Sequence, residues 1–176
     1  MESFFTGYDP VTLEERFDVT GAEHRLEELA DRRGLAELVE KIGLLRITGD
    51  PDAALEVANE AARQARFAGD REPVLQVRIA RAQVLRVQGK LDQAMQDLST
   101  AIIEAEAADL WQIVAEARRQ RALVKIALDD LHGARDDFNE ALVVLVREHA
   151  GPTDIDSTMI ALGALLDRAG SSAPEA

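Results

Sequence analysis

The densest group of residues that could hold a metal ion lies in one short segment. It contains Asp129, Asp130, His132, Asp136 and Asp137, and carboxylate oxygens are the ligands that a hard divalent cation prefers. Aspartates at a helix start have a simpler role, because a carboxylate there accepts free backbone N–H groups and interacts favourably with the helix dipole. We therefore expect helix capping at this segment, and no metal ion or other cofactor.

Signatures of catalysis are missing from the rest of the sequence. The three histidines, His24, His132 and His149, form no His-x-x-x-His pair, and the chain has no cysteine. It also has no Gly-rich phosphate loop and no Gly-x-Ser-x-Gly elbow. Trp111 could stack on a ligand, but a single Trp at a helix start more often packs against a neighbouring element. We expect no catalytic residues and a protein that is not an enzyme.

Composition and charge narrow the class of protein. The formal net charge of −13 repels phosphate backbones, so nucleic acid and anionic membranes are not expected partners. Hydrophobic residues make up 47% of the chain but aromatic residues only 4%, and such aliphatic, alanine-rich chains favour helices over sheets. No apolar stretch reaches the roughly 20 residues of a membrane span, and the first residues lack the pattern of a secretory signal. We expect a cytoplasmic protein.

The elements that position these residues repeat along the chain with a period of 40 residues. Gly49-Asp50-Pro51-Asp52-Ala53-Ala54 is followed by Gly89-Lys90-Leu91-Asp92-Gln93-Ala94 and then by Asp129-Asp130-Leu131-His132-Gly133-Ala134. Such a fixed period indicates stacked copies of one structural unit.

Each copy predicts two helices joined by a tight turn. The first helices are expected at 35–48, 73–88 and 111–128, and the second helices at 51–68, 91–108 and 131–149. Gly49 and Gly89 suit the left-handed residue that ends a helix, and Asp50 suits an N-cap. Small residues recur where helices must approach closely, at Ala54, Ala61, Ala94, Ala101, Ala134 and Ala141.

The middle copy, Ala80–Ala101, resembles a tetratricopeptide repeat (TPR). The small residue of the family's first helix stands at Ala82, its turn glycine at Gly89, and the alanines of its second helix at Ala94 and Ala101. The 40-residue period is similar to the long variants found in kinesin light chains and in sensor domains of bacterial regulators. The resemblance covers about two thirds of the chain. It implies an all-α fold, a right-handed α-solenoid of three antiparallel helix pairs with a C-terminal capping helix.

The domain organisation follows from the repeats. Residues 1–19 form an N-terminal extension of undetermined structure, and a capping-box pattern from Thr20 to Glu23 predicts a helix through Arg32. The repeat domain is expected over 20–169, with repeats at about 35–72, 73–110 and 111–150, a capping helix at 154–169 and a disordered tail at 170–176. The capping helix is unusually apolar, which leaves a homodimer through this end as an alternative.

Charge divides between the two kinds of helix. In the second and third repeats the first helices carry a net +6 and the second helices a net −6. The resemblance implies that the first helices line a concave groove, which would favour an acidic peptide. The other interpretation is that the arginines pair with carboxylates of adjacent helices. The partner-binding residues implied by the resemblance are Val39, Arg46, Ile79, Gln83, Arg86, Arg119, Leu123 and Ile126.

The expected function is a non-catalytic module that binds a peptide or partner protein in this groove. Two alternatives stay open: a homo-oligomerising scaffold, and a sensor of a signal peptide or small effector like the TPR domains of bacterial regulators.

Overall fold

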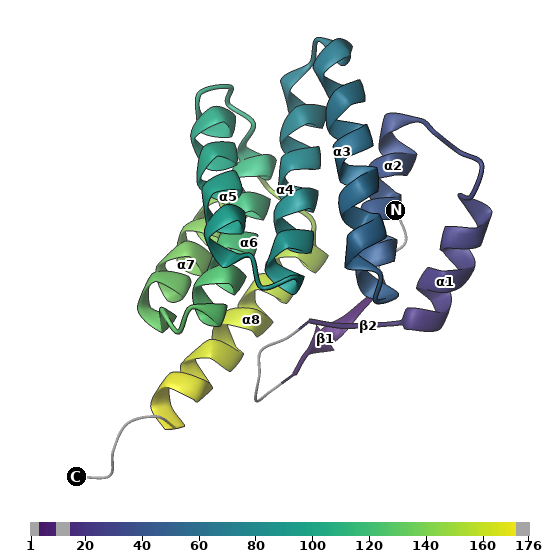
Figure 1. Cartoon of the computed structure of the whole chain (residues 1–176). Helices are drawn as coiled ribbons and strands as arrows, with labels where there is room; N and C mark the ends of the chain where they lie inside the picture. The colour runs from purple at the N-terminus through teal and green to yellow at the C-terminus, as the bar shows by residue number, and fades with distance from the viewer. Residues whose placement is uncertain (1–3, 10–14, 172–176) are drawn as a thin grey trace.

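The computed structural model describes residues 4–9 and 15–171. In these residues it consists of a two-stranded hairpin followed by eight helices (Figure 1). The elements are β1 (Phe5–Tyr8), β2 (Glu15–Phe17), α1 (Val19–Glu28), α2 (Leu35–Ile47), α3 (Pro51–Ala68), α4 (Arg71–Val87), α5 (Leu91–Glu106), α6 (Trp111–Ala127), α7 (Leu131–Arg147) and α8 (Pro152–Ser171). The protein is therefore all-α apart from the hairpin.

The six helices predicted from the repeat are confirmed as α2 to α7, with ends that differ by no more than one or two residues. The helix expected at 154–169 is longer and runs from Pro152 to Ser171. The tail expected from residue 170 therefore begins inside this helix, and residues 172–176 lie outside the described part of the chain.

The 40-residue period of the sequence also appears in the backbone conformation. A residue with positive φ follows each of the helices α2 to α7, and these residues lie 20 positions apart: Gly49, Gly69, Gly89, Asp109, Asp129 and His149. A left-handed residue lets the chain leave the helix and reverse direction. Aspartate and histidine adopt this conformation more readily than most residues, so they replace glycine in the later turns.

The helices α2 to α7 alternate between two rows: we call α2, α4 and α6 the inner row, and α3, α5 and α7 the outer row. Each helix from α2 onward packs against the next one, and α4 also contacts both α2 and α6. The six recurring alanines, expected at close helix contacts, are all fully buried. Beyond the rows, α8 packs against α7, and its Ala161 and Leu165 join a core cluster with Ile126 and Phe138.

The N-terminal extension, for which the sequence predicted no structure, forms the hairpin. Phe5 pairs with Phe17, and Tyr8 with Glu15, in antiparallel register. The following helix starts two residues earlier than the capping box predicted, because Asp18 rather than Thr20 caps it by accepting a hydrogen bond from the backbone N–H of Gly21. It also ends at Glu28 and not at Arg32 as predicted. In Figure 1 the hairpin lies below the helix rows, between α1 and α8.

Candidate functional site

The second hairpin strand directs two side chains toward the helices. Because side chains alternate along a strand, Glu15 and Phe17 share one face while Arg16 takes the other. The Glu15 side chain is only 10% exposed, whereas that of Arg16 is 60% exposed. The hairpin thus presents a carboxylate and an aromatic ring to the inner row of helices.

The Glu15 carboxylate lies between two arginines from different repeats. Its Oε2 is 2.6 Å from Nη2 of Arg86, at the end of α4, and 3.6 Å from Nη1 of Arg46, at the end of α2. The Arg46 guanidinium also lies 4.8 Å from the centroid of the Phe17 ring, a cation–π arrangement. Burial lowers the pKa of Arg46, while the charge of Glu15 raises it and that of Arg86 lowers it further. The single carboxylate of Glu15 therefore lies close to two buried guanidinium groups.

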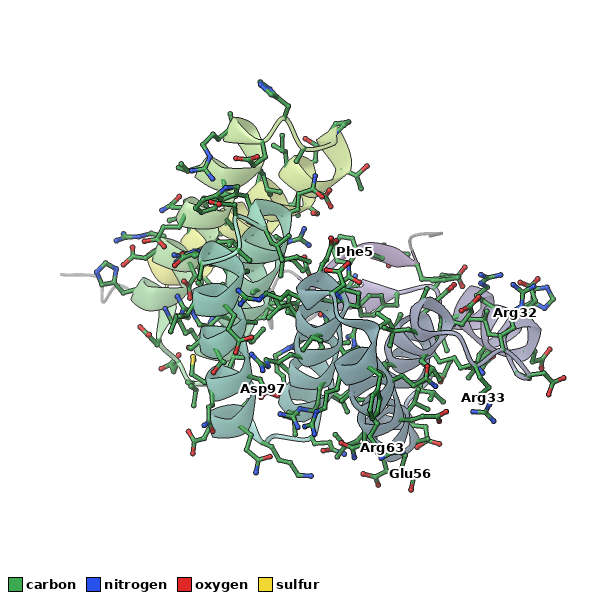
Figure 2. The ribbon with its side chains drawn as sticks, turned by 90° about the horizontal axis from the view of Figure 1, so that it is seen from above. Phe5, Arg32, Arg33, Glu56, Arg63 and Asp97 are labelled. Atoms are coloured by element: carbon green, nitrogen blue, oxygen red, sulfur yellow. The ribbon has the colours of Figure 1, made fainter. Side chains whose placement is uncertain are left out.

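A cavity of about 390 Å³ lies between the hairpin and the helices α2, α4, α6 and α8. We call the surface of α2, α4 and α6 that lines it the inner face. Its lining includes the rings of Phe5 and Phe17 from the hairpin and Gly43, Leu44 and Ile47 from α2. The volume falls within the range of small ligand sites. In Figure 2 the label of Phe5 shows where the hairpin lies. The exposed residues Arg33, Glu56 and Arg63 are labelled on other parts of the surface.

The far side of the cavity is polar. Arg119 of α6 lies 3.6 Å from the carboxylate of Glu116 and 3.7 Å from that of Asp154 on α8. Gln83 of α4 donates a hydrogen bond to Glu116. The cavity therefore combines an apolar part near the hairpin and α2 with a charged part between α6 and α8.

Several buried polar atoms around this face make no hydrogen bond within the described residues. They are Nε of Arg46, Nε of Arg86 and Oε1 of Gln120, and Gln120 lines the cavity. A buried polar group left without a partner costs about 1–3 kcal/mol. All three atoms are covered by protein, and of their residues only Gln120 lines the cavity.

A second stripe of basic residues on α4 and α6 pairs with the outer helices α5 and α7. Asp97 of α5, which is labelled in Figure 2, accepts hydrogen bonds from Arg81 of α4. The pairs are Arg78 with Glu104, Arg81 with Asp97, Arg118 with Glu106 and Glu140, Arg121 with Asp137, and Lys125 with Asp137. For this stripe, internal pairing is the correct interpretation of the basic charge.

Four of the eight sequence-predicted binding residues reach the inner face or its edge. Gln83 and Arg119 line the cavity, and Arg46 and Arg86 hold Glu15. The structure therefore brings these four together beneath the hairpin, although none of them is freely exposed.

The apolar members of the predicted set lie elsewhere. Ile79 and Leu123 are 4% exposed and Ile126 is 8% exposed, so all three belong to the core and not to a binding surface. Their side chains pack toward neighbouring helices, and α8 covers Ile126. Val39 is partly buried and packs against the core cluster formed by α2, α3 and α4.

Sequence reasoning missed the hairpin residues Glu15 and Phe17 and the cavity residue Gly43. One signal was present: four of the seven aromatic residues of the chain fall within its first 17 positions. Aromatic residues favour strands, so this cluster in a helical protein pointed to a different local structure.

The acidic segment from Asp129 to Asp137 contributes a helix cap and ion pairs. Asp130 accepts a hydrogen bond from the backbone N–H of Gly133 and caps α7, and Asp137 pairs with Arg121. Across the described residues, no three His, Asp or Glu side chains converge as metal ligands.

Trp111 lies under the guanidinium of Arg147, 4.2 Å from the ring centroid. Among the described helices, none combines the length and apolar character that crossing a membrane requires.

Comparison with solved structures shows a likeness of fold. No protein-family model matches the chain, and no curated protein matches it. The solved structure of BtubC (BKLC) from P. vanneervenii aligns over 86% of this chain with a TM-score of 0.64 and 19% identity. The alignment spans 65% of that protein, so this chain matches less than two thirds of its length. At this identity the likeness concerns the fold alone.

Proposed function

We propose that this chain is a non-catalytic interaction module that holds a peptide or partner protein on the inner face of a TPR-like array. The fold in this proposal is a right-handed α-solenoid of three antiparallel helix pairs, with α8 as its capping helix. The left-handed residues spaced 20 positions apart and the contacts among α2, α4 and α6 support it. In that fold the inner face is the concave one.

The cavity of about 390 Å³ is the observation that carries the function. It adjoins apolar rings and ion pairs, a mixture suited to a peptide with both apolar and polar side chains. The carboxylates of its lining outnumber Arg119, so an acidic side chain of the peptide fits at Arg46 and Arg86, which hold Glu15, rather than against these carboxylates. None of the three histidines lines it, and its Ser157 hydroxyl donates to the backbone carbonyl of Asp154. This lining supports binding rather than catalysis, and the net charge supports a protein partner rather than nucleic acid or membrane.

Affinity capture with a matched pair of variants tests the proposal. A Cβ at Gly43 meets nothing within 4 Å, and the same is true at Gly163 on α8, but only Gly43 lines the cavity. Gly43→Gln therefore fills the cavity, and Gly163→Gln is the matched control. We expect the wild-type chain and Gly163→Gln to retain one shared partner that Gly43→Gln loses. A partner retained equally by all three chains would mean that the inner face is not the binding site.

Self-assembly through α8 is the second candidate function. Three of its apolar side chains, Met159, Ile160 and Leu166, are 57%, 55% and 50% exposed. A second copy covering this face would bury them. Sedimentation would then show a mass that rises with concentration, and Ile160→Glu would return the chain to a monomer. The remaining alternative, an effector sensor, predicts a small molecule in the cavity instead of a polypeptide.

A further inference from the structure

The hairpin occupies the same face on which the proposed function places the partner. Its Glu15 carboxylate reaches Arg86 and Arg46, and its Phe17 ring lies against the Arg46 guanidinium. Phe5 packs edge-to-face on Phe17 with the ring centroids 6.1 Å apart. The hairpin therefore already makes the charged and aromatic contacts that a bound peptide would make.

The arginine site is only partly satisfied by the hairpin. The Arg46 side chain is 9% exposed and that of Arg86 is 14% exposed, yet one carboxylate serves both. The Nε atoms of both arginines remain without a hydrogen bond among the described residues. Two buried cations that share one close carboxylate keep an excess of positive charge, and an incoming carboxylate in the place of Glu15 would be attracted by the same charge.

The hairpin is joined to the helices by a short connection. Asp18 separates β2 from α1, and its backbone N–H donates to the carbonyl of Phe4 at 2.9 Å. On the face of the hairpin that points away from the helices, the Arg16 side chain is exposed and pairs with Asp9 of the hairpin itself. Besides the Glu15 and Phe17 contacts, β1 contacts α8, and Phe4 packs against the cluster of Ala22, Leu29 and Leu44. A partner that replaces the hairpin must therefore also break these contacts, which lie outside the stack of helices α3 to α7.

Resting on the proposed function, we infer that the hairpin is a built-in competitor for the inner face. Glu15 and Phe17 occupy the site in cis, and a partner segment with an acidic residue two positions before an aromatic residue replaces them. The occupant is a partner protein, because the carboxylate and ring of the hairpin define what the site accepts. The apparent affinity for the partner is then the intrinsic affinity of the inner face multiplied by the fraction of chains in which the hairpin is open.

The test uses the full chain and a probe peptide that copies residues 4–18, labelled with fluorescein. Glu15→Gln weakens the closed hairpin, and Glu23→Gln makes the same change at an exposed position on α1. Removing a charge-assisted contact is worth about tenfold in affinity, so we expect the probe to bind Glu15→Gln about tenfold more tightly than the wild-type chain or Glu23→Gln. A probe carrying Gln in place of its own glutamate should lose about the same factor.

Hydrogen exchange shows whether the hairpin opens and whether the variant is folded. We expect faster exchange in β1 and β2 of Glu15→Gln and unchanged exchange in α4 to α7. Phe17→Leu is a second opening variant that leaves the carboxylate in place, and it should also increase probe binding. Equal probe binding by the wild-type chain and both opening variants would overturn the inference, as would a Glu15→Gln chain that dimerises by exchanging hairpins.

The two proposals fail in different ways. If a captured partner depends on Gly43 but binds the wild-type chain and Glu15→Gln equally, the inner face is the binding site and the hairpin is not a competitor. If the capture finds no partner that depends on Gly43, the proposed function itself is wrong.

Discussion

Arg121 and Asp137 form a two-pronged ion pair that joins α6 to α7. Nε of the arginine lies 2.8 Å from Oδ2 and Nη2 lies 2.6 Å from Oδ1. One repeat earlier, Arg81 and Asp97 make the same pair at the same two distances, joining α4 to α5. Each pair thus bridges the inner and outer rows within one repeat. Together with the pairs made by Arg78, Arg118 and Lys125, these pairs account for much of the opposite charge on the two kinds of helix.

Removing the acid from each pair should have unequal effects on stability. The Asp137 side chain is 3% exposed and also contacts Lys125, whereas that of Asp97 is 12% exposed and its partner Arg81 is 41% exposed. We expect Asp137→Ala to lower the free energy of unfolding by about 3 kcal/mol, because it leaves buried cations unpaired. Asp97→Ala should cost about 1 kcal/mol, since solvent screens its partner. Urea denaturation measures both, and equal losses would contradict the account.

Acid should selectively weaken the Asp137 contact. Burial raises the pKa of Asp137, but hydrogen bonds from Arg121 and Lys125 outweigh this, so the pKa lies below its ordinary value of 3.8. The unfolded chain therefore takes up the proton first as the pH falls. The stability from this group is present above about pH 5 and is lost as the pH falls toward the folded-state pKa.

The matched measurement compares the wild-type chain with Asp137→Asn, which cannot titrate at this position. We expect the difference between their unfolding free energies to narrow below about pH 5. A difference that stays constant on acidification would show that Asp137 keeps its ordinary affinity for protons in the folded chain.

Two glycine-to-alanine changes should shift stability in opposite directions. Gly89 has a φ of 72° in the turn between α4 and α5, where a Cβ costs about 1 kcal/mol. Gly43 lies within α2 with open space around its Cβ position, so alanine there should stabilise the chain by about 0.5–1 kcal/mol. Thermal unfolding of the two variants checks both signs, and a stabilised Gly89→Ala would contradict the assigned turn.

The helices could be predicted from the sequence because their ends carry strong local signals. Gly49 and Asp50 combine a left-handed residue with an N-cap, and Asp129 and Asp130 repeat this combination two periods later. The middle copy keeps the left-handed residue, Gly89, but its Lys90 makes no side-chain cap. Buried alanines such as Ala94 and Ala134 fixed the phase of the second helices. These signals act over a few residues, so a single sequence is enough to detect them.

The composition of the candidate site was harder to predict. One helix has two adjacent sides, and the sequence alone did not settle which side of α4 and α6 meets the neighbouring helices. Ile79 and Leu123 were therefore assigned to the groove although they lie in the core. Glu15 was missed because its role depends on Arg86, 71 residues away, and a contact of that separation leaves no periodic signal.

Chemical-shift mapping by NMR with the captured partner segment tests the central claim most directly. The amide of Gly43 and the side-chain amides of Gln83 and Gln120 report on the cavity. Ile103 and Val143, which are both 67% exposed on the outer helices, report on the opposite surface. The account predicts shifts concentrated at the three cavity residues. Shifts concentrated at Ile103 and Val143 would contradict it.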